Sequence, residues 1–80
     1  MDIPKIGSLS PKWQDEQFCK EQLQNHLFEV GHLMTKKDPH ALNELADLLI
    51  IAHHILVESG RGQEIVDVRF EKFKQKAKGE

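Results

Sequence analysis

Two pairs of residues in this 80-residue chain have side chains and a spacing suited to binding a metal ion, and each pair contains an acidic residue. Glu44 and Asp47 lie three positions apart, so on a helix they point the same way, as two ligands of one divalent cation must. Glu29 and His32 repeat that spacing earlier in the chain. If the two segments are neighbouring antiparallel helices, four side chains able to bind a metal converge.

A structural interpretation of the same residues is also open. One side of segment 39–59 carries a strip of polar residues, namely Asn43, Glu44, Asp47, His54 and Glu58. Such a strip is typical of the side of a helix that faces water, and acidic groups near a helix N-terminus are favoured by the helix dipole. His53, among apolar neighbours, is expected to be a packed or hydrogen-bonded core histidine, and His54 and Glu58 are expected to form a surface pair.

Segment 39–59 is the clearest predicted helix. Asp38 is expected to cap it, Pro39 to occupy its first position, and Gly60 to follow its end in the left-handed conformation. Its apolar residues cover most of the circumference, whereas a surface helix shows an apolar stripe only somewhat wider than about 100°. We therefore expect this helix to be the central, buried helix of a bundle.

Two further helices are predicted. Ser10 and Pro11 favour a start for a helix over 11–36, and Gly60 to Gly62 favour a turn before a helix over 63–76. The apolar spacing predicts a buried face on each. The first face comprises Leu23, Leu27, Val30, Leu33 and Met34, and the second comprises Ile65, Val66, Phe70 and Phe73. Residues 1–10, which contain Pro4 and Gly7, are expected to form an irregular arm.

The size of the chain predicts a single domain, residues 1–80, with an all-α fold: a short helical bundle of about three helices per chain. A chain this short buries only about 60% of its unfolded surface when it folds alone. Phe18 and Phe28 also lie off the predicted buried face of segment 11–36 and suggest a second contact surface. We therefore expect homo-oligomerisation, as a homodimer or a larger assembly, to complete the bundle.

The charge balance argues against two classes of partner. Eleven basic and 13 acidic side chains give a net charge of -2, so there is no electrostatic reason to expect binding to nucleic acid or to an acidic membrane.

The chain opens without the basic and apolar regions of a signal peptide, and no stretch has the length of a membrane span. With a single cysteine, Cys19, the sequence favours a reducing, cytoplasmic location.

Segments 27–33 (LFEVGHL) and 43–50 (NELADLLI) resemble the MazG-type pyrophosphohydrolases, the all-alpha NTP pyrophosphatase superfamily. That family carries Glu-Glu-x-x-Glu on one helix and Glu-x-x-Asp on the next, and their carboxylates hold magnesium. The resemblance covers about residues 22–76. It implies that Glu29, Glu44 and Asp47 hold Mg²⁺ and serve in catalysis, and that a nucleoside triphosphate is cleaved to its monophosphate and pyrophosphate.

The sequence departs from the family motif at two positions. Phe28 stands where the family has its first glutamate, and His32 stands where it has its last. His32 is therefore the fourth ligand that the resemblance implies. Because magnesium prefers oxygen ligands and imidazole suits softer metals, this change makes Mn²⁺ the alternative cofactor.

Two other functions remain open from the sequence. The loss of two family carboxylates and the small size of the chain favour a non-catalytic helical module that binds another protein. A Glu-x-x-His pair also occurs in carboxylate-bridged di-iron bundles, which need two such pairs. This chain has one, Glu29 and His32, unless a dimer supplies the second.

Overall fold

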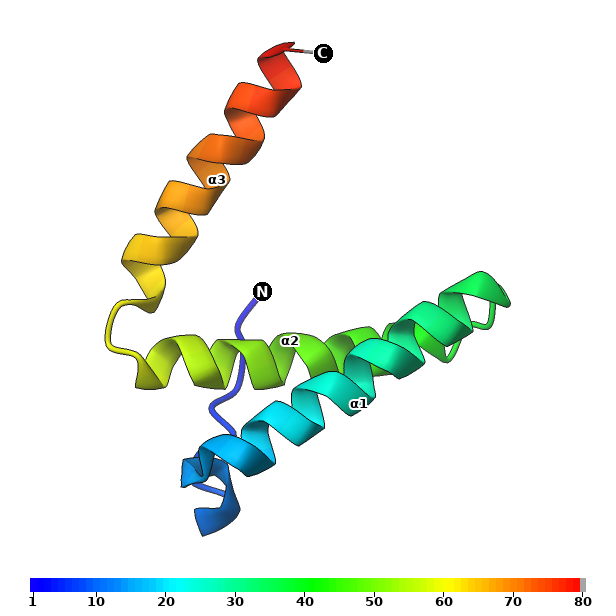
Figure 1. Cartoon of the computed structure of the whole chain (residues 1–80), viewed down its shortest axis with the longest axis vertical. Helices are drawn as coiled ribbons and strands as arrows, with labels where there is room; N and C mark the ends of the chain where they lie inside the picture. Colours follow the sequence, from blue (N-terminus) through cyan, green and yellow to red (C-terminus); the bar gives the residue numbers. More distant parts are fainter. Residues whose placement is uncertain (80) are drawn as a thin grey trace.

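The computed structural model describes residues 1–79 and contains one short 3-10 helix and three α-helices (Figure 1). The 3-10 helix η1 spans Pro11–Gln14, and the α-helices are α1 (Glu16–Thr35), α2 (Ala41–Glu58) and α3 (Gly62–Gly79). No strand occurs within residues 1–79. These elements confirm the predicted all-α class with three helices. Among the helices described, none is long and apolar enough to cross a membrane.

The region predicted as one helix over 11–36 is divided by two capping residues. The Ser10 hydroxyl accepts a hydrogen bond from the Lys12 amide (3.3 Å) and caps η1. Asp15 then adopts an extended conformation, and its carboxylate accepts a hydrogen bond from the Gln17 amide (3.0 Å). Because Asp15 offers a second cap, α1 begins anew at Glu16 instead of continuing from η1.

The turn between α1 and α2 is a Schellman motif with a lysine in the left-handed position. Lys37 has φ 58°, its amide donates to the Met34 carbonyl (3.0 Å), and the Asp38 amide donates to the Leu33 carbonyl (3.0 Å). The Asp38 carboxylate accepts a hydrogen bond from the His40 amide (2.9 Å). This bond, together with one from the His40 side chain, lowers the pKa of Asp38. The α2 helix begins at Ala41.

Replacing Lys37 by glycine is expected to stabilise the protein. The left-handed conformation costs a side-chain-bearing residue about 1–2 kcal/mol, and part of the relief is offset by the greater entropy of glycine in the unfolded chain. Lys37→Gly should therefore raise the free energy of unfolding in urea by roughly 0.5 kcal/mol. Lys37→Ala removes the same charge without relieving the backbone and should not stabilise, so equal gains in both variants would contradict this interpretation.

The α1 and α2 helices run antiparallel and enclose a small core (Figure 1). Its buried apolar residues are Cys19, Val30, Ala41 and Ile51. The predicted inner face of α1 is only partly right, because Leu27 and Met34 are exposed. The face that meets α2 instead follows Cys19, Leu23, His26, Val30 and Leu33. Because this face includes a histidine, a search for apolar residues at helical spacing does not identify the face.

His54 is the buried histidine of α2, and the predicted surface pair with Glu58 is wrong. The His54 residue is 5% exposed, and its Nε2–H donates to the Trp13 carbonyl (2.7 Å). The Trp13 ring contacts the Phe18 ring edge to face, with centroids 4.9 Å apart. The arm and η1 therefore cover the face of α2 that carries His54. The neighbouring His53 is half-buried, and its Nδ1 has no hydrogen-bond partner within residues 1–79.

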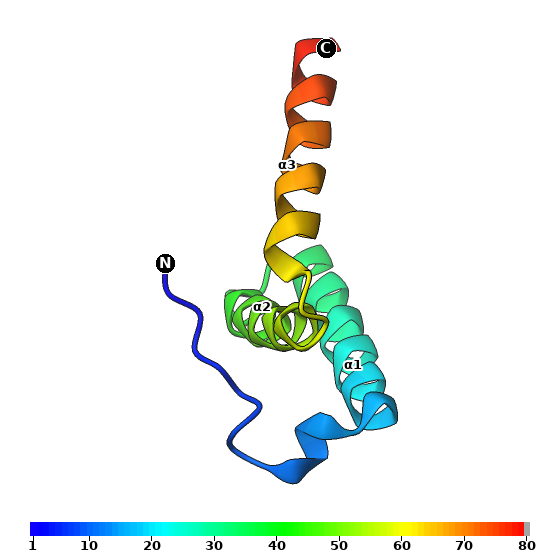
Figure 2. The same cartoon turned by 90° about the vertical axis from the view of Figure 1, so that its left-hand side faces the viewer.

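The α3 helix projects away from the α1/α2 pair. Figures 1 and 2 both show it leaving the end of α2 on the side away from η1 and from the start of α1. Gly60 has φ 73°, which confirms the predicted left-handed turn. A side chain at Gly62 would come within 2.7 Å of the Leu56 carbonyl oxygen, so α3 starts in close contact with α2. No residue of α3 is buried, and the predicted burial of its apolar face is not reached in the single chain.

The α2 helix is likewise covered on only part of its surface. Ile51 and His54 are buried against α1 and the arm, whereas Leu42, Leu45 and Leu49 are exposed. These three leucines lie along one face of α2. The single chain thus leaves an apolar face of its central helix open, and the self-association predicted to cover it stays a prediction.

Candidate metal centre

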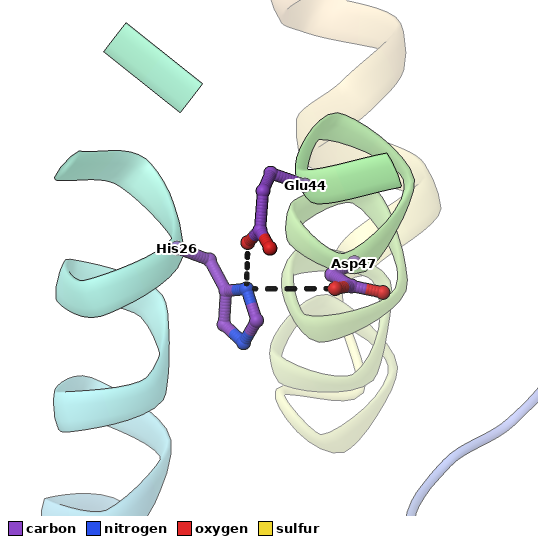
Figure 3. Close-up of side chains that lie close together, drawn as sticks. All are labelled: His26, Glu44 and Asp47. Carbon is purple, nitrogen blue, oxygen red and sulfur yellow. Dashed lines mark hydrogen bonds and ion pairs between the residues drawn. The ribbon is translucent and has the colours of Figure 1, made fainter. Parts of the chain in front are cut away.

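His26 of α1 meets Glu44 and Asp47 of α2 across the helix pair (Figure 3). Its Nδ1 lies 2.7 Å from Glu44 Oε2 and 3.6 Å from Asp47 Oδ2. One ligand atom from each of the three residues lies within 4.8 Å of the other two. We refer to these three residues as the His26 cluster.

The helices place the cluster at the boundary between core and solvent. Glu44 and Asp47 stand one turn apart near the start of α2, and antiparallel packing brings the middle of α1 opposite them. The His26 and Glu44 side chains are 25% and 27% exposed, whereas the Asp47 side chain is 50% exposed. The cluster is therefore walled by the two helices and reached from solvent past Asp47.

The donor set fits a divalent transition metal better than magnesium. One imidazole nitrogen and two carboxylates are ligands that Mn²⁺, Fe²⁺ and Zn²⁺ accept, while Mg²⁺ prefers a shell of oxygens. Three protein ligands would leave positions for water or a substrate oxygen. The Nδ1–H group of His26 donates a hydrogen bond to the Glu44 carboxylate, so an ion bound to Nδ1 must displace that proton. In the absence of an ion, the hydrogen bond itself pairs His26 with Glu44 and holds α1 to α2.

The structure brings together two of the four ligands that the sequence predicted. Glu44 and Asp47 belong to the His26 cluster. Glu29 and His32 are exposed on α1 and lie outside it, and the His32 ring is stacked on the Phe28 ring with centroids 6.2 Å apart. Glu29 is one helical turn beyond His26 on the same helix.

His26 was absent from the predicted ligands, although the sequence contains a signal for it. The residue lies three positions after Leu23 and four before Val30, in register with the face that packs on α2. A polar side chain in that register must find a polar partner on the opposing helix. Identifying that partner as Glu44 requires the register between α1 and α2, which the periodicity of either helix alone does not define.

A cavity of about 250 Å³ adjoins the cluster and shares His26 and Asp47 with it. Its walls are mainly apolar and include Ile6 of the arm and Trp13 of η1, together with isoleucines of α2. Gln22 of α1 contributes an amide. The cavity thus combines apolar walls, one uncharged hydrogen-bonding group and an edge of possible metal ligands.

Comparison of the chain with protein-family models, with curated proteins and with solved structures found no significant match. The resemblance to the MazG-type pyrophosphohydrolases accordingly rests on the residues of segments 27–33 and 43–50.

Proposed function

We propose that the protein is a metal-dependent nucleotide pyrophosphohydrolase that cleaves a nucleoside triphosphate to its monophosphate and pyrophosphate. The observation that carries the proposal is the convergence of His26, Glu44 and Asp47 at the edge of a cavity. The reaction class comes from the resemblance of the Glu44-x-x-Asp47 helix and its neighbour to the MazG-type enzymes. The cofactor is Mg²⁺ or, given the imidazole, Mn²⁺.

Each residue has a distinct part in this proposal. Glu44 and Asp47 supply the negative charge that holds the ion, and His26 supplies the nitrogen. A bound divalent ion offsets phosphate charge and lowers the pKa of a coordinated water. Because Asp47 is the most exposed of the three, the phosphates approach from its side. The apolar cavity beside it, with the Gln22 amide, suits the flat faces and polar edge of a nucleobase.

The resemblance adds Glu29 and His32 to the ligand set. Both side chains are exposed on α1, where Glu29 stands one turn from His26. The metal ligands supplied by α1 are then either Glu29 and His32 or His26. These two ligand sets predict different effects of substitution on metal binding. His26→Gln, Glu29→Gln and His32→Gln, compared under the same conditions, separate the two sets.

Divalent metal should raise the melting temperature, with Mn²⁺ more effective than Mg²⁺. An ion bound only by the folded state, at a hundredfold excess over its Kd, stabilises by about 2.7 kcal/mol, which raises the melting temperature of a domain of this size by roughly 15 °C. His26→Gln should lose most of the Mn²⁺ response. His40→Gln, which removes an exposed histidine outside the cluster, should keep it.

The same metal response should weaken at acidic pH, because protons compete with the ion for imidazole and carboxylate ligands. The measurement is thermal melting with each metal at neutral and acidic pH. A wild-type protein that responds to no divalent ion at neutral pH would contradict the metal site and leave the His26 cluster as a hydrogen-bonded ion pair.

Turnover is tested directly with a panel of nucleoside triphosphates, incubated with Mg²⁺ and then with Mn²⁺ and assayed for pyrophosphate. Release of pyrophosphate and monophosphate in equal amounts supports the proposal. A folded protein that releases none with either metal favours the second candidate, a non-catalytic helical module. The specific observation behind that candidate is the exposed apolar face of α2 formed by Leu42, Leu45 and Leu49.

Self-association belongs to both candidates. We propose that the chain forms a homodimer or a larger assembly, since exposed apolar faces on α2 and α3 are unfavourable in water. Neither candidate requires nucleic acid or a membrane as a partner.

A further inference from the structure

The α3 helix presents an apolar stripe that nothing in its own chain covers. Val66, Phe70, Phe73 and Ala77 follow each other at steps of four, three and four residues, which places them on one face of the helix. Phe73 is 66% exposed. This spacing is typical of a helix that inserts into a groove.

Two cations, Arg69 and Lys76, lie beside one edge of this stripe on the helical wheel, and a third, Lys72, lies further round on the same side. Within residues 1–79, the ion pairs of α3 and its preceding turn are Lys74–Glu71 and Arg61–Glu64, so none of the three cations has a carboxylate partner there. The stripe therefore has one strongly basic margin.

A groove of matching character lies at the end of the α1/α2 pair that is remote from the α1–α2 turn. It has a volume of about 530 Å³ between the start of α1 and the end of α2. Trp13, Leu23 and Ile55 contribute apolar surface to it, and Glu16 and Glu58 contribute carboxylates. Its basic lining residues are Lys20 and His54, and the His54 ring is hydrogen-bonded to the Trp13 carbonyl.

The chemistry of Cys19, which also lines the groove, reflects the negative charge there. Burial, and then the charges of Asp15, Glu16 and Glu58, raise the pKa of the Cys19 thiol. The groove is thus apolar within and acidic at its rim, while the α3 stripe is apolar at its centre and basic at its margin.

In the structure, the α3 helix points away from its own groove. It leaves the end of α2 on the side opposite to η1 and the start of α1 (Figures 1 and 2). The close approach of Gly62 to the Leu56 carbonyl fixes the start of α3 against α2. A second copy of the chain can offer its α3 without rearranging this turn.

We infer that α3 of one chain docks in the groove of a second copy, and that the exchange is reciprocal. Phe70 and Phe73 enter the groove against Trp13, Leu23 and Ile55. The basic margin of α3 meets Glu16 and Glu58. The same patch pair is then used twice, as a closed two-fold dimer requires. This inference deepens the proposed self-association and does not depend on hydrolysis.

Paired charge reversal tests the exchange. Glu16→Lys with Glu58→Lys makes the groove basic, and Arg69→Glu with Lys76→Glu makes the α3 margin acidic. Each variant alone should fail to dimerise at low salt, because like charges meet at both contacts. An equimolar mixture should form a one-to-one heterodimer in sedimentation, since both contacts are then complementary. Added salt should reduce the discrimination.

Substitution of the apolar stripe provides an independent measurement. Phe73→Ser should raise the dimer dissociation constant about thirtyfold, as expected for the loss of a buried aromatic anchor. Val68→Ser, on the opposite side of α3 and exposed, is the matched control and should leave the constant unchanged.

Three results would overturn the exchange: a monomeric wild-type protein, charge variants that each dimerise like wild type, or a mixture that does not associate. The melting response to Mn²⁺ is measured on the same samples. A melting response to Mn²⁺ in a protein that forms no dimers refutes the exchange but not the metal site. Dimers that show no melting response to Mn²⁺ refute the metal site but not the exchange.

Discussion

Ile51→Asp is expected to unfold the protein at room temperature. Ile51 is 3% exposed, the lowest value among the core residues, and lies on the face of α2 that meets α1. The substitution removes a buried apolar side chain and places an unpaired charge there, at a cost of roughly 4–5 kcal/mol or more. A domain of this length has a total stability of about 4–12 kcal/mol, and the small core here favours the lower end.

Circular dichroism and urea titration measure this loss, and two further measurements make it specific. Val57→Asp introduces the same charge on the same helix at a residue that is 44% exposed, and it should change stability by no more than about 0.5 kcal/mol. The Cys19 thiol, buried and with a raised pKa, should react slowly with an alkylating reagent in wild type and quickly in Ile51→Asp. A cooperative unfolding transition and a protected thiol in Ile51→Asp would contradict the proposed core.

Glu44→Gln is expected to lower kcat/KM for pyrophosphate release about a thousandfold, a loss of roughly 4 kcal/mol of transition-state stabilisation. The amide oxygen of glutamine can still accept the hydrogen bond from His26, so the fold should persist while the charge proposed to hold the ion is lost. Steady-state kinetics with Mn²⁺ give the value. Glu21→Gln, which removes an exposed carboxylate of α1 outside the cluster, is the matched control.

Glu29→Gln in the same series decides the extent of the ligand set. A loss equal to that of Glu44→Gln assigns Glu29 to the metal, as the resemblance implies. An unchanged rate restricts the ligands to His26, Glu44 and Asp47. Wild-type turnover by a folded Glu44→Gln variant would contradict the metal-dependent mechanism as a whole.

The sequence predicted those parts of the fold that depend on local interactions. The cap at Ser10 and the left-handed turn at Gly60 each depend on a few neighbouring residues, and both are present in the structure. The helix predicted over 39–59 is present as α2, Ala41–Glu58, and begins two residues later than predicted. The break before α1 was missed because Ser10 and Asp15 both offer caps within a few residues. The two caps are local signals of similar strength, so the sequence alone does not show at which of them the long helix begins. The packing of η1 determines this.

The candidate site was only half predictable for a different reason. Glu44 and Asp47 share one helix, so their spacing alone places them together. The ligand from α1 depends on how two helices are rotated against each other, and the apolar pattern suggested a face turned toward Leu27 and Met34. His54 was predicted at the surface because its contacts with Gly7 and with the Trp13 carbonyl join residues far apart in the chain, and no local period encodes such contacts.

Trp13 links the groove at one end of the α1/α2 pair with the cavity beside His26. Its side of η1 forms part of the wall of both the groove and the cavity beside His26, and its carbonyl accepts hydrogen bonds from Cys19 and His54. Because the Trp13 backbone is bonded to both helices and the residue lines both spaces, a displacement of Trp13 by an occupant of one space would alter the wall of the other. If α3 docks in the groove and a nucleotide binds in the cavity, as proposed, the two events are linked: the factor by which docked α3 changes the affinity for nucleotide equals the factor by which nucleotide changes the affinity between chains.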